Sequence, residues 1–394
     1  MSSTDRWSDA FLNELRSKGD ALADEALSLI VSDNELANIT TLFREMDSND
    51  DFPPSHHFPQ LSDFLRKTNE LPPGADLNRI RRGEDIFREH IFECAIVLLM
   101  RSLPEGYAAP NLAIILNISG QLETHTFKRL LATLQMVVNV MTSRGFQPGG
   151  KAVITAQKLR LLHAGIRHLA DRYRPAFRAK YGVPVNLEDM LVTIMGFSYI
   201  LLMGLRTLNV GLTPEEEEDC FYLWKIYALL MGIHPEGHPE SDAYLPGSMD
   251  DAAQFYDAYK RRHYVAAEVN PDGVALADAD LRMLRGKVPI LLRLFGFGAA
   301  PHIYMRELMG NEACDRIGIA PVRGHNLLKW FLAHVHTLLH PVEKVDAQGL
   351  GRMGEIMFQD MITKAYNGEV TFTVPTTLKA LKEIVRNSKS PAVD

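Results

Sequence analysis

Residues 158–168 read KLRLLHAGIRH, and this stretch is the clearest example of the pattern that runs through most of the chain. At about 100° per residue, Leu159 and Ile166 fall on the same side of a helix as His163, whereas His168 points nearly the opposite way. The stretch is therefore expected to form a helix, with His163 at the centre of an apolar stripe.

The same periodicity recurs along the chain, with apolar residues three and four positions apart between Pro- and Gly-rich breaks. The segments expected to be helical are residues 4–46 (two or three helices), 76–103, 107–118, 122–142, 151–181, 186–209, 214–232, 250–264, 276–285, 289–309, 323–340 and 350–366. Residues 369–374 alternate as a strand does, but strands and helices do not alternate, and the sequence has no P-loop and no GxGxxG motif. The sequence therefore predicts an all-α fold, built as one large single-domain helical bundle.

One helix start is marked clearly by the residues around Thr213. Thr213 suits the N-cap position, Pro214 the first helical position and Glu216 the third, which together form a strong helix-start signature. Segments 186–209 and 214–232 are accordingly expected to form a helical hairpin that turns at this point.

Length, composition and charge exclude several classes of protein. The 394 residues are 46% hydrophobic and 23% charged, which is ordinary for a soluble globular protein and unlike a disordered or low-complexity chain. A net charge of −7 argues against a general nucleic-acid-binding protein, which needs a basic surface. Three cysteines, far apart and without a CxxC pair, argue against a disulfide scaffold and a zinc ribbon.

The N-terminus and the longest uncharged run indicate where in the cell the protein is expected. The first 20 residues lack the basic segment and apolar stretch of a secretion signal, so a cytoplasmic protein is expected. The longest uncharged run covers residues 190–205, which falls short of the roughly 18 to 20 residues that cross a bilayer. We expect this run to be a helix buried in the core, with no transmembrane segment; a peripheral membrane contact stays open.

Two arginines, Arg160 and Arg167, lie about one turn before and after His163 on the predicted helix. A haem site needs an imidazole nitrogen for the iron, apolar contacts for the porphyrin and cations for the propionates. His163 is the candidate iron ligand, and the two arginines are the candidate propionate partners. The alternative is a core histidine hydrogen-bonded to a carbonyl oxygen, with surface arginines along a helix edge; the spacing alone fits both.

The preceding helix carries a second candidate set. His125, Arg129 and Thr133 are four residues apart and share one face, which Met136 and Val140 continue as an apolar stripe. This arrangement suits the distal wall of a pocket, in which Arg129 binds an oxyanion or a propionate and Thr133 orients a bound oxygen species. The alternative is a helix edge that is simply half-exposed.

Several motifs then occur in a fixed order between about residues 70 and 265. They are LPEGYAAP (103–110), SGQL (119–122), RLLAT (129–133), FQPGG (146–150), LRLLHAGIR (159–167) and GVPVN (182–186). As an ordered set, they resemble the core of the latex-clearing-protein (rubber oxygenase) family. This is a family of haem b oxygenases with fungal relatives that cleave prenyl chains.

The resemblance implies an all-α fold with a globin-like core that holds one haem b. It assigns the proximal iron ligand to His163, and it places Arg129 and Thr133 on the distal side. The reaction that it implies is the oxidative cleavage of an isoprenoid double bond by dioxygen. The expected function is thus a haem-dependent oxygenase that acts with dioxygen on a small lipophilic substrate.

Two departures from the family pattern alter this expectation. Family members can present a lysine to the iron three residues after the distal arginine, but that position is Ala132 here. The distal side is then either open or water-bound, which we favour, or capped by His125. Rubber-cleaving members also carry an export signal, which is not seen in this sequence, so a small apolar molecule inside the cell is a better expected substrate than rubber.

The expected organisation has three parts within one domain. Residues 1–70 form an N-terminal helical extension, residues 71–270 the haem-binding core, and residues 271–394 C-terminal helices that complete the domain.

Two other functions stay open at this point: a haem-binding or gas-sensing protein without turnover, and a helical module with no cofactor. The sequence does not determine the oligomeric state.

Overall fold

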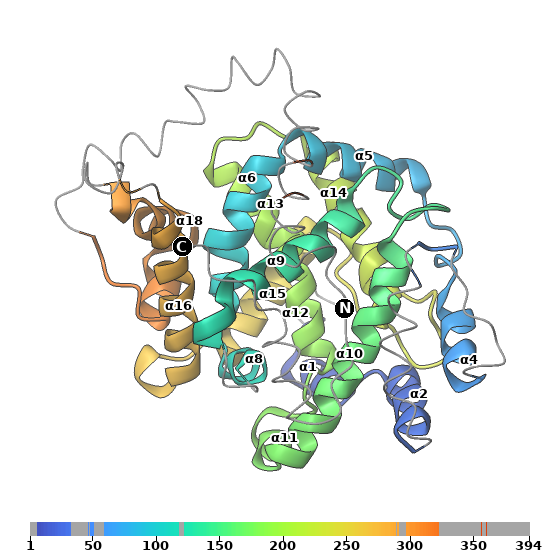
Figure 1. Ribbon diagram of the computed structural model, residues 1–394. Helices are drawn as coiled ribbons and strands as arrows, with labels where there is room; N and C mark the ends of the chain where they lie inside the picture. The colour runs from blue at the N-terminus through green and yellow to red at the C-terminus, as the bar shows by residue number, and fades with distance from the viewer. Residues whose placement is uncertain are drawn as a thin grey trace.

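The computed structural model of the protein describes residues 6–32, 46, 48–50, 59–117, 122–288, 290, 297–322, 356 and 360; for residues 30–32, 59–60, 122–129 and 297 it describes the backbone alone. Every regular element within these residues is a helix, and no strand occurs among them (Figure 1). The prediction of an all-α fold is confirmed.

The helices run in chain order from the N-terminal α1 to α18. They are α1 (Asp9–Arg16), α2 (Ala21–Ser32), α4 (Pro59–Thr68), α5 (Leu77–Glu89), α6 (Ile91–Val97), the π-helix η2 (Leu98–Ser102), α7 (Leu103–Gly106), α8 (Pro110–Leu116), α9 (Leu122–Met141), α10 (Ala152–Tyr173), α11 (Ala176–Tyr181), α12 (Leu187–Phe197), α13 (Tyr199–Thr207), α14 (Pro214–Leu230), α15 (Met249–His263), the short 3-10 helix η3 (Ala267–Val269), α16 (Pro271–Lys287), the 3-10 helix η4 (Phe297–Ala299) and α18 (Ala300–Arg316).

Three of the predicted long helices are interrupted. The segment predicted as 76–103 breaks at His90, whose backbone leaves the helical region (φ −120°, ψ 33°), and it continues as α6, η2 and α7. Helix α10 stops ahead of Pro175, because a proline disfavours helical backbone at the residue before it, here Arg174 (φ −135°, ψ 57°). Helices α12 and α13 are separated at Ser198 (φ −115°, ψ −88°), a break that no proline marks in the sequence.

The helix start predicted at Thr213 is confirmed. The Oγ1 atom of Thr213 accepts a hydrogen bond from the backbone N–H of Glu216 at 3.3 Å, and Glu216 Oε2 accepts one from the backbone N–H of Thr213 at 2.7 Å. This reciprocal pair, with Pro214 as the first helical residue, fixes the start of α14. Helix α14 packs against α12, as the predicted hairpin requires.

Helix α16 begins at Pro271 rather than at the predicted Leu276. Asn270 caps its first turn by accepting a hydrogen bond from the N–H of Gly273 at 3.1 Å, and the proline takes the first helical position. Of the segment predicted as 289–309, the second half lies in α18. The helices and the strand predicted beyond residue 322 lie outside the described residues, apart from positions 356 and 360.

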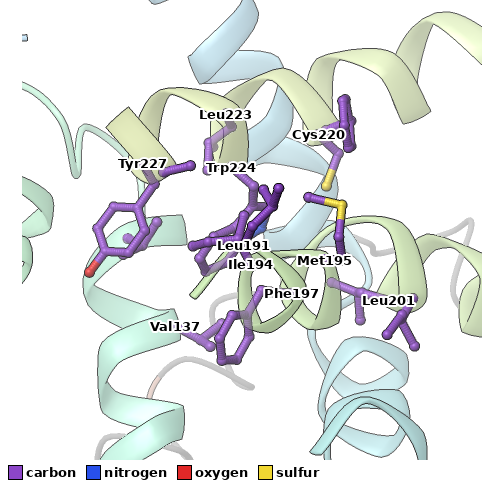
Figure 2. Close-up of a cluster of buried hydrophobic side chains, with 14 of the residues drawn as sticks. Val137, Leu191, Ile194, Met195, Phe197, Leu201, Cys220, Leu223, Trp224 and Tyr227 are labelled. Carbon is purple, nitrogen blue, oxygen red and sulfur yellow. The ribbon is translucent and has the colours of Figure 1, made fainter. Parts of the chain in front are cut away.

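The main core is built around α12 and α13, which run through the middle of the molecule (Figure 1). Trp224 of α14 is fully buried and stacks on Phe197 of α12, with ring centroids 5.1 Å apart. The ring of Tyr227 meets Trp224 edge-on at 5.5 Å. Figure 2 shows these rings with Val137 of α9 beside Phe197. Helices distant in sequence therefore share one apolar interior.

Helices α5 and α14 come very close because α5 carries a glycine where they cross. A Cβ atom at Gly83 would lie 3.0 Å from the carbonyl oxygen of Asp219. The carboxylate of Asp219 accepts a hydrogen bond from Arg79 Nε at 2.6 Å and another from Arg82. Burial alone would raise the pKa of Asp219, but the two guanidinium groups outweigh burial and lower it.

The apolar run predicted to be a core helix forms α12, α13 and the break between them. Among the described residues, 187–207 is the one segment long and apolar enough to cross a membrane, with a mean hydropathy of 1.6. Of the 18-residue window that meets this criterion, 72% is buried inside the protein. The segment therefore packs as the central core of the bundle.

Replacing Trp224 by alanine should lower the free energy of unfolding by about 3 to 5 kcal/mol, because the change leaves a large cavity against Phe197 and Tyr227. Urea unfolding followed by circular dichroism measures this loss. Leu77→Ala is the control, because Leu77 is 42% exposed and its removal should cost less than about 0.5 kcal/mol. Similar losses for the two variants would contradict the assignment of Trp224 to the core.

Candidate functional site

Helix α10 has two buried faces that meet different parts of the protein. Ala156 and Leu159 pack against the main core around α12 and α14. Leu161 and Ala164 pack against α2 and α4 in a second apolar cluster, which includes Phe64. One turn beyond Leu159, the first of these faces reaches His163. The helix therefore presents His163 on the side that turns toward the main core.

Around His163 this face of α10 is no longer fully covered. Leu159, His163 and Ile166 are all half-buried, whereas Leu161 and Ala164 on the other side are buried. A half-buried apolar surface of this kind has room to contact a bound apolar group. The surface formed by Leu159, His163 and Ile166 is called the α10 surface.

Helix α9, which precedes α10 in the chain and packs against it, shows a similar change (Figure 1). Leu131 and Leu134 are buried in the main core, but Ala132 and Thr133 between them are half-buried. Thr133 is therefore accessible, as its predicted place in a site requires. The side chains of His125 and Arg129 lie outside what the structure describes, so their predicted roles stay predictions.

His163 is neutral at physiological pH and has an unpartnered ring nitrogen. Its Nδ1 atom is buried and makes no hydrogen bond. Burial of the ring, helped by the positive charge of Arg167, lowers its pKa to about 4, although Asp20 acts in the opposite sense. A neutral imidazole with a free lone pair is the form that binds a metal ion. The residue therefore fits the role of an iron ligand.

Arg160, one predicted propionate partner, is buried and fully engaged by protein groups. Its Nε and Nη2 atoms donate to the two carboxylate oxygens of Asp20 at 2.6 and 2.9 Å, and its Nη1 donates to the carbonyl oxygen of Leu230 at 3.2 Å. Burial would raise the pKa of Asp20, but the guanidinium of Arg160 reverses this and lowers it. Arg160 is therefore not the surface arginine of the alternative interpretation, and its predicted contact with a propionate stays a prediction.

Arg167 makes a comparable pair on the other side of His163. Its Nε atom donates to both carboxylate oxygens of Asp24 at 2.7 and 3.0 Å, and Nη1 donates to the carbonyl oxygen of Val185 at 3.3 Å. Its Nη2 atom is buried without a partner. Arg167 therefore keeps one donor for a further anion, and its predicted contact with a propionate stays a prediction.

The two arginine pairs also determine where His163 lies. Asp20 directly precedes α2, and Asp24 lies in the first turn of α2. Their ion pairs with Arg160 and Arg167 therefore join α2 to α10 at positions three residues before His163 and four residues after it. Burial raises the pKa of Asp24 even with Arg167 beside it. The arginines act on the candidate site through the position of the helix.

Sequence reasoning missed a buried polar cluster at the start of α12. Glu188 is fully buried and contacts His263 Nε2 at 2.9 Å and Arg262 Nε at 2.9 Å. Asp189 beside it accepts a hydrogen bond from Tyr259 at 3.0 Å, and burial raises its pKa to about 6. The sequence does place these two carboxylates, Glu188 and Asp189, directly before a long apolar run. The same pattern also occurs at an ordinary helix start, so it did not indicate a buried cluster.

Helix α12 has one accessible residue, Thr193, whereas its other ten residues are buried. The hydroxyl group of Thr193 donates to the carbonyl oxygen of Asp189 at 2.8 Å. Within the described ranges, no group of three or more His, Cys, Asp or Glu side chains is arranged to hold a metal ion.

Comparison with known proteins identifies the family. The model of the family described as "ER-bound oxygenase mpaB/B'/Rubber oxygenase, catalytic domain" matches residues 93–338. The chain belongs to this family. The matched region contains both α9 and α10, and with them every residue of the candidate site. The protein is therefore an oxygenase.

Two known proteins are similar to this chain over most of its length. The rubber oxygenase of Streptomyces sp. (strain K30) is 23% identical over 305 residues, which cover 76% of this chain and 70% of that protein. A solved structure of latex clearing protein LCP in the closed state superposes with a TM-score of 0.69 at 19% sequence identity, over 95% of this chain and 90% of that one. The second likeness confirms the fold.

The pKa of His163 predicts a pH dependence of the protein without cofactor. The unfolded chain binds a proton near pH 6.5 and the folded chain near pH 4, so stability should fall as the pH is lowered through this window. The full shift is worth about 3 kcal/mol, and water around the half-buried ring should reduce it to about 1 to 2 kcal/mol. Urea unfolding of wild type and His163→Leu at pH 7 and pH 4.5 measures the difference.

His168→Leu on the exposed face of the same helix is the matched control, and it should keep the wild-type pH dependence. If His163→Leu also keeps the wild-type dependence, the ring is not held neutral by its surroundings.

Proposed function

We propose that this oxygenase binds haem b through His163 and uses dioxygen to cleave a carbon–carbon double bond in a small lipophilic, isoprenoid-like substrate. The observation that carries the proposal is the neutral imidazole of His163, with a buried, unpartnered nitrogen, in the middle of the half-buried α10 surface. Its setting in a chain of the rubber-oxygenase family supports the choice of cofactor and the class of substrate.

The bound haem would supply the iron that binds and activates dioxygen. The residues of this chain would hold it and exclude water. His163 would offer its lone pair to the iron, and the low pKa keeps protons from competing for that lone pair above about pH 4. Leu159 and Ile166 would contact the porphyrin on either side of the histidine. The ion pairs of Arg160 and Arg167 would keep α10 in place.

The distal side is assigned to α9 on the strength of the sequence motif and the accessibility of Thr133. Thr133 would orient oxygen species, and Arg129 would stabilise negative charge that develops on them. Ala132 has no group that can bind iron, so the iron would be left open to water or dioxygen on this side, unless His125 reaches it. An open position suits an oxygenase, because no strong ligand has to leave first.

The substrate would be lipophilic and would enter where the core is accessible. Thr193 is the accessible point on α12, and its neighbours along the helix are apolar. An apolar helix surface of this kind excludes water and binds a hydrocarbon chain without a specific polar contact.

Reaction with a panel of isoprenoid alkenes of different length, followed by oxygen consumption and product analysis, tests the substrate class. Haem binding without oxygen consumption would point to a protein without turnover.

His163→Ala should lose most of the bound haem while the protein remains helical, because this imidazole is the one strong bond expected between protein and iron. The ratio of Soret absorbance to protein concentration measures occupancy, and circular dichroism measures folding. His168→Ala, on the exposed side of the same helix, should keep the wild-type ratio. Full haem occupancy in His163→Ala would exclude this residue as the ligand.

The ferric protein should be high-spin in its resting state and should bind cyanide or imidazole readily, because Ala132 leaves the distal position open. His125→Ala should not change the resting spectrum. Absorption and electron paramagnetic resonance spectra of both proteins measure the spin state. A low-spin wild type that becomes high-spin in His125→Ala would identify His125 as a distal cap and would refute the open site.

A further inference from the structure

Cations are concentrated where α10 ends and α11 begins. Arg172, Arg174, Arg178 and Lys180 are all exposed, and they lie within nine residues of a chain whose net charge is −7. Figure 1 shows α11 at the lower end of the molecule, projecting beyond α1 and α2. This segment, residues 172–180, is called the basic tip. A local excess of positive charge on an acidic protein calls for an explanation.

Most of the charge on the basic tip is available to a partner. Arg178 pairs with Asp171 at 2.6 Å. Arg172, Arg174 and Lys180 have no carboxylate within ion-pair distance in the described part of the chain. Three exposed cations that no carboxylate of the described residues neutralises create a positive potential that extends about a Debye length into the solvent.

The basic tip also presents an aromatic side chain, and its C-terminal end is hydrogen-bonded to Arg16. Tyr173 is 41% exposed, and the guanidinium of Arg172 lies 5.6 Å from the centre of its ring. The C-terminal end of α11 is fixed by Arg16, whose Nε and Nη2 atoms donate to the carbonyl oxygens of Tyr181 and Lys180 at 2.8 and 2.7 Å. Exposed cations beside an exposed tyrosine favour the interface of an anionic bilayer, where the ring contacts the acyl boundary and the cations contact lipid phosphates.

We infer that the basic tip docks the protein on anionic membrane surfaces. Docking here would place the bilayer at the end of the helix that carries His163, ten residues and about 15 Å from it along the helix axis. Under the proposed function, a lipophilic substrate dissolved in the bilayer would then meet the protein close to the candidate site. The docking itself rests on the cations and Tyr173 of the basic tip, so a failure of the haem proposal would leave it unchanged.

The test is cosedimentation of the full-length protein with vesicles, which needs no catalysis. Vesicles of phosphatidylcholine with about 30% phosphatidylserine should bind the protein at about 0.1 M salt, and binding should be largely lost at about 0.5 M salt. Vesicles of pure phosphatidylcholine should bind it at least about tenfold more weakly. Equal binding to both vesicles, or none to either, would overturn the proposal.

The variant Arg172→Gln/Arg174→Gln/Lys180→Gln removes the three unpaired cations and should weaken binding to the anionic vesicles by at least about tenfold. The matched control changes three exposed cations that also lack ion pairs in the described chain but are scattered over the surface: Arg81→Gln/Arg261→Gln/Arg285→Gln. It removes the same total charge and should bind nearly as the wild type does. Equal losses for the two variants would show a net-charge effect and would overturn the docking site.

A further variant separates a membrane from an acidic protein partner. Tyr173→Ser keeps every cation, and it should weaken binding to anionic vesicles without changing binding to soluble polyglutamate. Circular dichroism confirms that each variant is folded. Tight binding to polyglutamate with no binding to vesicles would assign the basic tip to an acidic macromolecule and would refute the membrane proposal.

Discussion

The buried ion pair between Arg160 and Asp20 is the constraint on which the arrangement around His163 depends. Both side chains are almost completely removed from solvent, so each charge is tolerated only because the other is present. Gly232 lies against the pair with φ +83°, and a Cβ there would approach Arg160 Nη2 to 3.1 Å. The backbone therefore makes room for the guanidinium, and the pair fixes α10 against the N-terminal helices.

The sequence predicted the all-α class, most of the helices and the helix that carries His163, because these follow from local periodicity and capping. It did not predict the break at Ser198 or the π-helical turn at Leu98–Ser102, since the pattern of apolar residues continues through both. Nothing local marks these positions. They depend on how neighbouring helices pack, which a single sequence does not reveal.

The candidate site was predictable to a similar extent. The apolar stripe placed His163 on the same side of α10 as Leu159, which packs against the main core, and the order of motifs indicated the family. The partners of Arg160 and Arg167 were not predictable, because Asp20 and Asp24 lie about 140 residues earlier in the chain. The buried contact of Glu188 with His263 also joins residues distant in sequence. Spacing shows which side chains share a helix face, but it does not show which distant groups meet them.

The pairing of both arginines with protein carboxylates has a consequence for how the proposed haem would be loaded. If cofactor carboxylates completed these ion pairs, the apoprotein would contain buried, unpaired cations and would fold poorly before loading. Here Asp20 and Asp24 already neutralise the two cations that flank His163 on α10. If the chain binds haem as proposed, the polypeptide can therefore reach its final fold first and receive the cofactor as a late step. Loading would then be limited by delivery of the cofactor rather than by folding of the chain.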